Sequence, residues 1–134
     1  MPSKPKLGQN FLNDPQAIDR IVAALGDLSS RTVVEIGPGA GAITAPLAAR
    51  AHHVIAIEYD HHLALHLRVQ FPTDKLTVVE QDVLNFDFAA AASSADQKLV
   101  AVGNLPYYIT SPILLKLAAS HTAVSYTHLC LSPK

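Results

Sequence analysis

The sequence is poor in the features that would mark a secreted, membrane or disordered protein. Its single cysteine, Cys130, excludes an intrachain disulfide, so a reducing, cytoplasmic compartment is expected. No apolar run approaches the roughly 18 residues of a membrane span, and none follows the polar opening Met1–Lys6 as a signal peptide would require. With 49% hydrophobic and only 16% charged residues, the 134-residue chain is expected to form one globular domain.

An excess of positive charge is also missing. Ten lysines and arginines stand against eleven acidic residues, which gives a formal net charge of −1. A domain that binds RNA by itself usually carries a basic face. Two explanations remain open at this point: the RNA-binding surface lies in another part of a longer protein, or the substrate is not RNA.

What the sequence does have is a regular alternation of apolar runs and helix-like segments. The apolar runs predict buried strands at residues 32–36, 53–58, 76–80 and 99–103. Helices are predicted from Pro15 to about Gly26 and over residues 42–50, 61–71 and 112–119, and residues 89–97 receive no assignment. This alternation predicts an α/β fold with a doubly wound parallel sheet, covered by helices on both faces.

The first polar signal follows the first predicted strand, at the edge where such sheets bind ligands. In Glu35-x-Gly37-x-Gly39-x-Gly41 the glycines allow a tight turn and a close approach of a ligand to the backbone. The segment also satisfies a dinucleotide-binding fingerprint. Glu35 favours a different ligand, because its carboxylate would repel a pyrophosphate and attract the sulfonium and ammonium groups of S-adenosylmethionine.

Two further carboxylates follow the next strands. Glu58 ends the second strand, where it can accept hydrogen bonds from both ribose hydroxyls of either cofactor. Asp82 follows the third strand and can accept a hydrogen bond from an adenine amino group. Each alone is more typical of a solvated loop. Together, at successive strand ends, they predict one nucleoside-binding site.

The most specific signal is Asn104-Leu105-Pro106-Tyr107, after the fourth strand. The N6 lone pair of adenine is delocalised, so two acceptors that hold both amino hydrogens favour its attack on a methyl group. The Asn104 side-chain oxygen and the Leu105 carbonyl can supply them, while Pro106 stiffens the turn and Tyr107 stacks on the base. Catalysis can then rest on positioning and electrostatics. By itself, the tetrapeptide also suits an ordinary strand-end turn.

These motifs, together with Leu7–Asp14, Glu58-Tyr59-Asp60 and Gln81-Asp82, resemble the ribosomal RNA adenine dimethylases over residues 4–118. The resemblance implies a Rossmann-like methyltransferase fold and N6,N6-dimethylation of adenosines in small-subunit rRNA by S-adenosylmethionine. It further implies a role in ribosome biogenesis, the rRNA or small ribosomal subunit as partner, no membrane and no oligomer. The expected catalytic residues are Asn104, Leu105, Pro106 and Tyr107, and the expected cofactor-binding residues are Gln9, Asn10, Leu12, Glu35, Gly37, Gly39, Gly41, Glu58, Asp82 and Asn104.

The family pattern stops near Ala119, although members of the family are longer and carry a basic helical C-terminal domain. Residues 1–119 are therefore expected to form the N-terminal part of the methyltransferase domain, truncated after the fourth strand. Residues 120–134 are expected to be a non-family tail, disordered or read through a cloning or sequencing junction. We expect the fourth strand to be an exposed edge, and the chain alone to be marginally stable and inactive.

Other functions remain open as alternatives. The chain can belong to a large-subunit rRNA adenine methylase, or to a non-catalytic RNA-binding ribosome-assembly or transcription factor that keeps the fold. An NAD-linked oxidoreductase is the least favoured, because of Glu35 and the Asn104–Tyr107 motif. His62 and His66 have helical spacing but no evident third ligand, so no metal site is expected.

Overall fold

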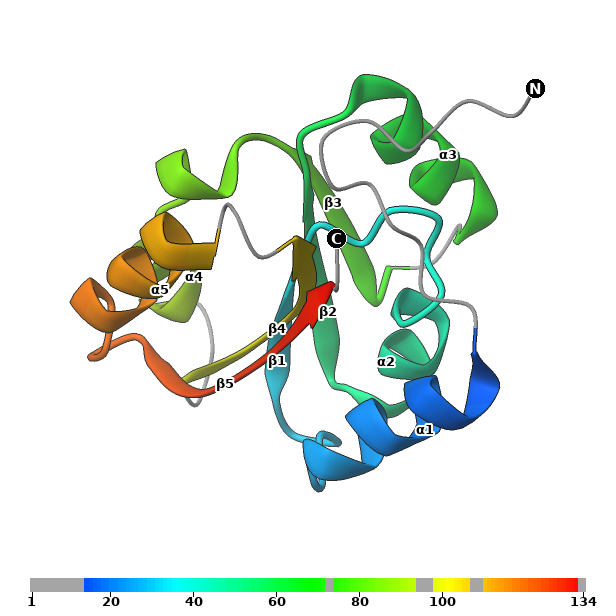
Figure 1. The fold of residues 1–134 in the computed structure, drawn as a ribbon, viewed down its shortest axis with the longest axis horizontal. Coiled ribbons are helices and arrows are strands. Elements are labelled where there is room, and N and C mark those ends of the chain that lie inside the picture. The colour runs from blue at the N-terminus through cyan, green and yellow to red at the C-terminus, as the bar shows by residue number, and fades with distance from the viewer. Residues whose placement is uncertain (1–13, 72–73, 94–97, 107–109, 133–134) are drawn as a thin grey trace.

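The computed structural model describes residues 14–71, 74–93, 98–106 and 110–132. Its centre is a five-stranded sheet in the order β3-β2-β1-β4-β5 (Figure 1), in which all neighbouring strands pair in parallel. The strands are β1 (Thr32–Ile36), β2 (His53–Glu58), β3 (Leu76–Glu80), β4 (Leu99–Pro106) and β5 (Val124–Ser132). The chain moves outward from β1 to β3 and then returns to β4 on the other side of β1. This reversal confirms the predicted doubly wound sheet and puts a topological switch point between β1 and β4.

Helices cover both faces of the sheet. In Figure 1, α1, α2 and α3 lie on one side, and α4 and α5 on the other. Neighbouring strand residues alternate between two hydrophobic cores: Val33 packs with α1 and α2, whereas Val34 packs with α4 and α5. The helices are α1 (Pro15–Ala24), α2 (Thr44–Arg50), α3 (His61–Gln70), the 3₁₀ turn η2 (Val83–Asn85), α4 (Phe88–Ser93) and α5 (Thr110–Ala119). None of them, within the described ranges, has the length and apolar character of a membrane span.

Aspartates precede and cap several of these elements. Asp14 accepts a hydrogen bond from Gln16 N at 3.0 Å, and Pro15 occupies the first turn of α1, as the sequence predicted. Asp60 accepts from the backbone of α3, and Asp82 accepts from Leu84 N in η2 at 3.0 Å. Because Asp60 and Asp82 lie two residues after the ends of β2 and β3, these caps fix where the chain turns at the ligand-binding edge.

Several predicted boundaries are corrected by the structure. The second helix begins at Thr44 and not at residue 42, because the glycine loop continues through turns as far as Ile43. The unassigned segment after residue 88 contributes most of α4, whose Phe88 is buried. The fourth strand runs on to Pro106, three residues beyond its predicted end.

The fifth strand was not predicted. Val124–Ser132 pairs with β4 from Leu99 to Pro106, with one register irregularity between Leu99 and Val100. The expectations that the sheet ends after four strands and that β4 is an exposed edge are therefore wrong. Residues 124–132 are rich in β-branched, aromatic and aliphatic side chains, which suit a strand whether or not they follow a family pattern.

Candidate functional site

The predicted polar segments converge at the carboxyl edge of the sheet. Ile36 lies opposite Ile57 of β2 on one side and opposite Gly103 of β4 on the other. The glycine loop that follows β1 therefore lies between the end of β2 and the Asn104 segment of β4. Asp82 is close to Glu58, since the preceding residue, Gln81, donates its N–H to the Glu58 carbonyl at 3.0 Å.

The glycine loop has a conformation that only glycine adopts without strain. Gly37, Gly39 and Gly41 have φ angles of +65°, +59° and +90°. Gly37 N donates to the Ile57 carbonyl at 2.9 Å, which ties the loop to β2. A Cβ atom on Gly41 would lie 3.0 Å from a ring carbon of Phe71 and 3.1 Å from Leu67 Cδ2. The loop is thus packed closely against the α3 side of the site.

Glu58 joins the glycine loop to the start of α3. Its side chain is 7% exposed, and its Oε1 accepts a hydrogen bond from Gly39 N at 3.1 Å while Oε2 accepts from Asp60 N at 3.0 Å. Burial raises the pKa of Glu58, against the opposite effect of these two backbone hydrogen bonds. The residue predicted to bind the ribose therefore also shapes the loop beside it.

Glu35 lies under the same loop. It is 2% exposed, and its Oε1 accepts a hydrogen bond from the Thr44 hydroxyl at 2.5 Å. Thr44 is the first residue of α2, so this bond joins the strand before the loop to the helix after it. Burial raises the pKa of Glu35 to about 7, the charge of Glu58 adds to this, and the hydrogen bond from Thr44 works against it. Thr44 is a site residue that the sequence analysis missed.

The buried negative charge at this site has no basic counterpart among the described residues. The ion pairs found there involve a different carboxylate, with Glu80 contacting His61 at 2.9 Å and Arg68 at 4.0 Å. The described ranges also contain no group of three or more histidine, cysteine or acidic side chains that could hold a metal ion. Two buried carboxylates without a cation favour a positively charged ligand and disfavour a phosphate.

Asp82 is half-buried at the end of β3, where its Oδ1 accepts from Leu84 N. It lies on the same edge as Glu58 but forms no hydrogen bond with it in the described structure. The nearby pair of His61 Nδ1 and Glu80, at 2.9 Å, joins α3 to the end of β3. That pair was not predicted, because neither residue belongs to a motif.

The end of β4 adjoins the glycine loop through Leu105. Leu105 is 2% exposed, and a Cβ atom on Gly37 would lie 3.9 Å from its Cδ2. Asn104 lies in β4 opposite Cys130 of β5. The side chains of Asn104 and Pro106 lie outside the described part of the structure, as do Tyr107, Gln9, Asn10 and Leu12 in full. Their roles stay predictions.

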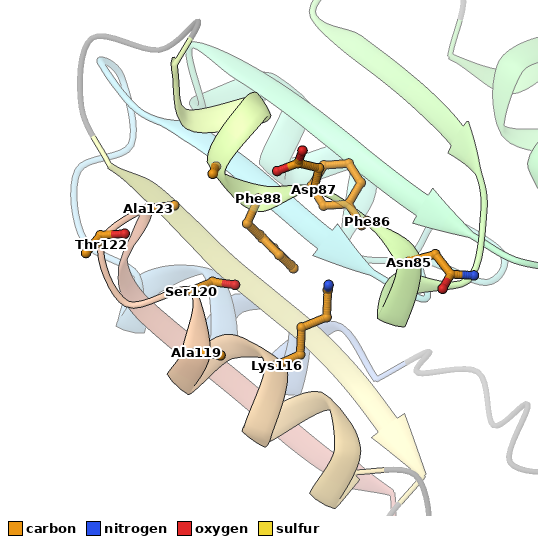
Figure 2. Close-up of a pocket in the computed structure, with 10 residues that line it drawn as sticks. Asn85, Phe86, Asp87, Phe88, Lys116, Ala119, Ser120, Thr122 and Ala123 are labelled. Carbon is orange, nitrogen blue, oxygen red and sulfur yellow. The ribbon is translucent and has the colours of Figure 1, made fainter.

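A separate cavity of about 350 Å³ opens among η2, α4 and α5 (Figure 2). Figure 2 shows Lys116 extending from α5 toward Phe88 of α4, and its Nζ lies 5.9 Å from the centre of that ring. None of the predicted site residues lines this cavity. Its lining residues are Asn85, Phe86, Asp87, Phe88, Ala89, Lys116, Ala119, Ser120, Thr122 and Ala123.

Comparison with known proteins shows the family to which this chain is similar. Residues 2–134 match the family described as ribosomal RNA adenine dimethylase. Ribosomal RNA small subunit methyltransferase A from Acidobacterium capsulatum is 56% identical over 122 residues, which cover 90% of this chain and 43% of that protein. The chain thus spans less than half the length of this relative. The family match extends beyond Ala119, and the division of the chain at that residue stays a prediction.

Two crystal structures share the fold. The 23S rRNA methyltransferase ErmE superposes with a TM-score of 0.79 at 30% identity, covering 92% of this chain and 48% of that one. A dimethyladenosine transferase from Plasmodium falciparum superposes with a TM-score of 0.76 at 28% identity, covering 92% and 44% of the two chains. These similarities confirm the predicted Rossmann-like methyltransferase fold.

Proposed function

Because this chain belongs to the ribosomal RNA adenine dimethylase family, we propose that it is the cofactor-binding part of an enzyme that methylates N6 of adenosines in ribosomal RNA. The methyl donor in this proposal is S-adenosylmethionine. The observation that carries the proposal is the pair of buried carboxylates, Glu35 and Glu58, on either side of a glycine loop at the switch point of the sheet.

The chemistry of these residues suits S-adenosylmethionine, which supplies a methyl group on a positively charged sulfur. Glu35 and Glu58 provide negative charge that no described basic side chain balances. Glu58 accepts from the ribose hydroxyls, and Asp82 accepts from the adenine amino group. A dinucleotide would instead bring a pyrophosphate against the two buried carboxylates, which favours the sulfonium cofactor over NAD.

In this proposal, residues at the end of β4 bind the target base. The Asn104 side-chain oxygen and the Leu105 carbonyl hold the two N6 hydrogens, and Tyr107 stacks on the flipped adenine. Leu105 supports this proposal, because its buried side chain adjoins Gly37 and so keeps the motif beside the cofactor loop. Positioning of this kind lets the nitrogen attack without a strong base.

The substrate in this proposal is small-subunit rRNA, and the enzyme acts in the cytoplasm. Support comes from the relative at 56% identity, which is named a small subunit methyltransferase. A large-subunit rRNA substrate is the second candidate, because ErmE at 30% identity is a 23S rRNA methyltransferase. The net charge of −1 agrees with phosphate contacts made by the part of the protein that this chain does not include.

The substrate proposal is tested by completing the chain with the remaining half of a family member and supplying small-subunit or large-subunit rRNA. We expect N6,N6-dimethyladenosine to form in the small-subunit rRNA. Methylation of the large-subunit rRNA alone would select the second candidate. Absence of methylation on both, with cofactor binding intact, would favour a non-catalytic factor.

A further inference from the structure

Glu35 and Glu58 place two carboxylates, 2% and 7% exposed, against one loop. An isolated buried carboxylate is strongly disfavoured, and such a group tends to take up a proton instead. The described ion pairs leave both residues without a cation. Glu58 is nevertheless well supplied with donors, since Gly39 N and Asp60 N bind its two oxygens. The described partner of Glu35 is a single hydroxyl, that of Thr44.

The charged groups that act on Glu35 are themselves acidic. On β2, Glu58 repels its negative form, and Asp60 beyond it repels Glu58 in turn. On α2, the neighbour is the neutral Thr44. The register partners of Glu35 on the two adjacent strands, Ala56 and Val102, are buried and apolar. Around neutral pH, Glu35 therefore holds its proton about half of the time, because burial raises its pKa to about 7.

Resting on the function proposed above, we propose that Glu35 exchanges its proton for the positive charge of the methyl donor. In the empty site at neutral pH, Glu35 is protonated about half of the time. When a sulfonium cation enters, the carboxylic O–H breaks, the proton leaves to solvent, and the carboxylate balances the new charge. The site thus responds to whether the bound sulfur is charged.

Through this exchange, Glu35 helps the site to distinguish the methyl donor from its product. S-adenosylhomocysteine has the same nucleoside and amino-acid groups but lacks the sulfonium charge. After methyl transfer, the sulfonium charge is gone and the α-ammonium is the positive group that remains, so the Glu35 carboxylate takes a proton back from solvent. The product is then bound without the sulfonium's share of the charge interaction that held the donor. Glu35 is in this account a positioning and charge-balancing residue, and Glu58 remains the ribose ligand.

The direct test is calorimetry on this full chain at neutral pH, with S-adenosylmethionine and S-adenosylhomocysteine as ligands. Each titration is run in phosphate and in Tris, because the different ionisation enthalpies of the two buffers reveal how many protons are released. We expect about half a proton to be released with the sulfonium ligand and clearly less with the neutral-sulfur ligand. Equal release with both ligands, or none with either, would overturn the proposal.

Two variants distinguish the loss of the Glu35 proton from a structural effect of the substitution. Glu35→Gln keeps the shape but cannot lose a proton, so we expect proton release to vanish and only the affinity for the sulfonium ligand to fall, by up to about tenfold. Thr44→Val keeps the carboxylate but removes a hydrogen bond that lowers its pKa. Release should then persist and move to higher pH. Unchanged release in Glu35→Gln would assign the proton to another group and refute the proposal.

A measurement without any variant decides the question if both substitutions prevent folding. The affinity ratio of the sulfonium to the neutral-sulfur ligand should rise by up to about tenfold per pH unit below the Glu35 pKa and level off above it. A ratio that stays flat from about pH 5.5 to about pH 8 would refute the proton exchange and leave the proposed function intact. Failure of both ligands to bind at every pH would contradict the proposed function as well.

Discussion

The two halves of the ligand-binding edge differ in what holds their functional residues in place. At the ends of β1 and β2, hydrogen bonds within the described structure fix the site: Glu58 binds Gly39 and Asp60, and Glu35 binds Thr44. At the end of β4, the target-base motif adjoins the glycine loop through the side chain of Leu105. Beyond β4, the described sheet continues with the unpredicted β5. The cofactor half, at the ends of β1 and β2, is thus held by hydrogen bonds among described residues, whereas the described contact of the base half, at the end of β4, is the packing of Leu105.

The largest expected effect comes from Asn104→Ala in a protein completed with the missing half. Loss of an acceptor for the N6 hydrogens should lower the rate of methylation by about 10²-fold or more, by analogy with the loss of one positioned hydrogen-bonding group. Affinity for S-adenosylhomocysteine should fall much less than the rate, because Glu58, Asp82 and the glycine loop still bind the cofactor although Asn104 is also expected to contact it. Rate and affinity are measured by single-turnover methylation and calorimetry. Full activity in the variant would remove Asn104 from the catalytic site.

The unfolding free energy of the chain should depend on pH because of Glu35, which lies in the cofactor half. In the folded chain burial raises the pKa of Glu35 from 4.5 to about 7, so the folded state binds more protons than the unfolded state between these values. Its contribution to stability is therefore complete below about pH 4.5 and is lost as the pH rises through about 7, by at most about 3 kcal/mol. Urea unfolding at a series of pH values measures this loss. Glu35→Gln should flatten the slope, and an unchanged slope would contradict the assignment.

Gly41→Ala should destabilise the cofactor half, because the added methyl group would clash with neighbouring side chains. Gly41 has φ +90°, and an added Cβ would lie 3.0 Å from the Phe71 ring. We expect a loss of about 2 kcal/mol in unfolding free energy together with loss of cofactor binding. Gly26→Ala is the matched control, because Gly26 has φ +76° but no atom lies within 4 Å of its added Cβ. The control should lose about 1 kcal/mol and keep binding. Equal effects in the two variants would show that the loop is not closely packed.

The smallest expected effect is that of a helix cap. Asp60→Ala removes the acceptor for the first turn of α3 and should cost about 1 kcal/mol of stability. Asp14→Ala removes the corresponding cap of α1, away from the glycine loop, at a similar cost. Only the first variant should also weaken cofactor binding, because Asp60 adjoins Glu58. Equal losses of cofactor binding in the two variants would mean that binding depends only on the overall stability of the chain.

Strands β1 to β3 were predictable from sequence, whereas the edge strand on the other side of the sheet, β5, was not. Residues 32–36, 53–58 and 76–80 form β1, β2 and β3 as predicted, because each is a short apolar run that ends in a turn or a polar residue. The fifth strand was not predicted, because residues 120–134 were expected to be a non-family tail. The contact of Thr44 with Glu35 was missed for a different reason. It joins residues nine positions apart across a loop, and no periodic pattern marks such a contact.

The central claim is that the half containing β1 to β3 holds an S-adenosylmethionine site by itself. The measurement that tests it most directly is a calorimetric titration of this chain with S-adenosylhomocysteine, with NAD as the control ligand and circular dichroism to establish that the chain is folded. The account predicts binding of S-adenosylhomocysteine and no binding of NAD. A folded chain that binds NAD, or that binds neither ligand, would contradict it.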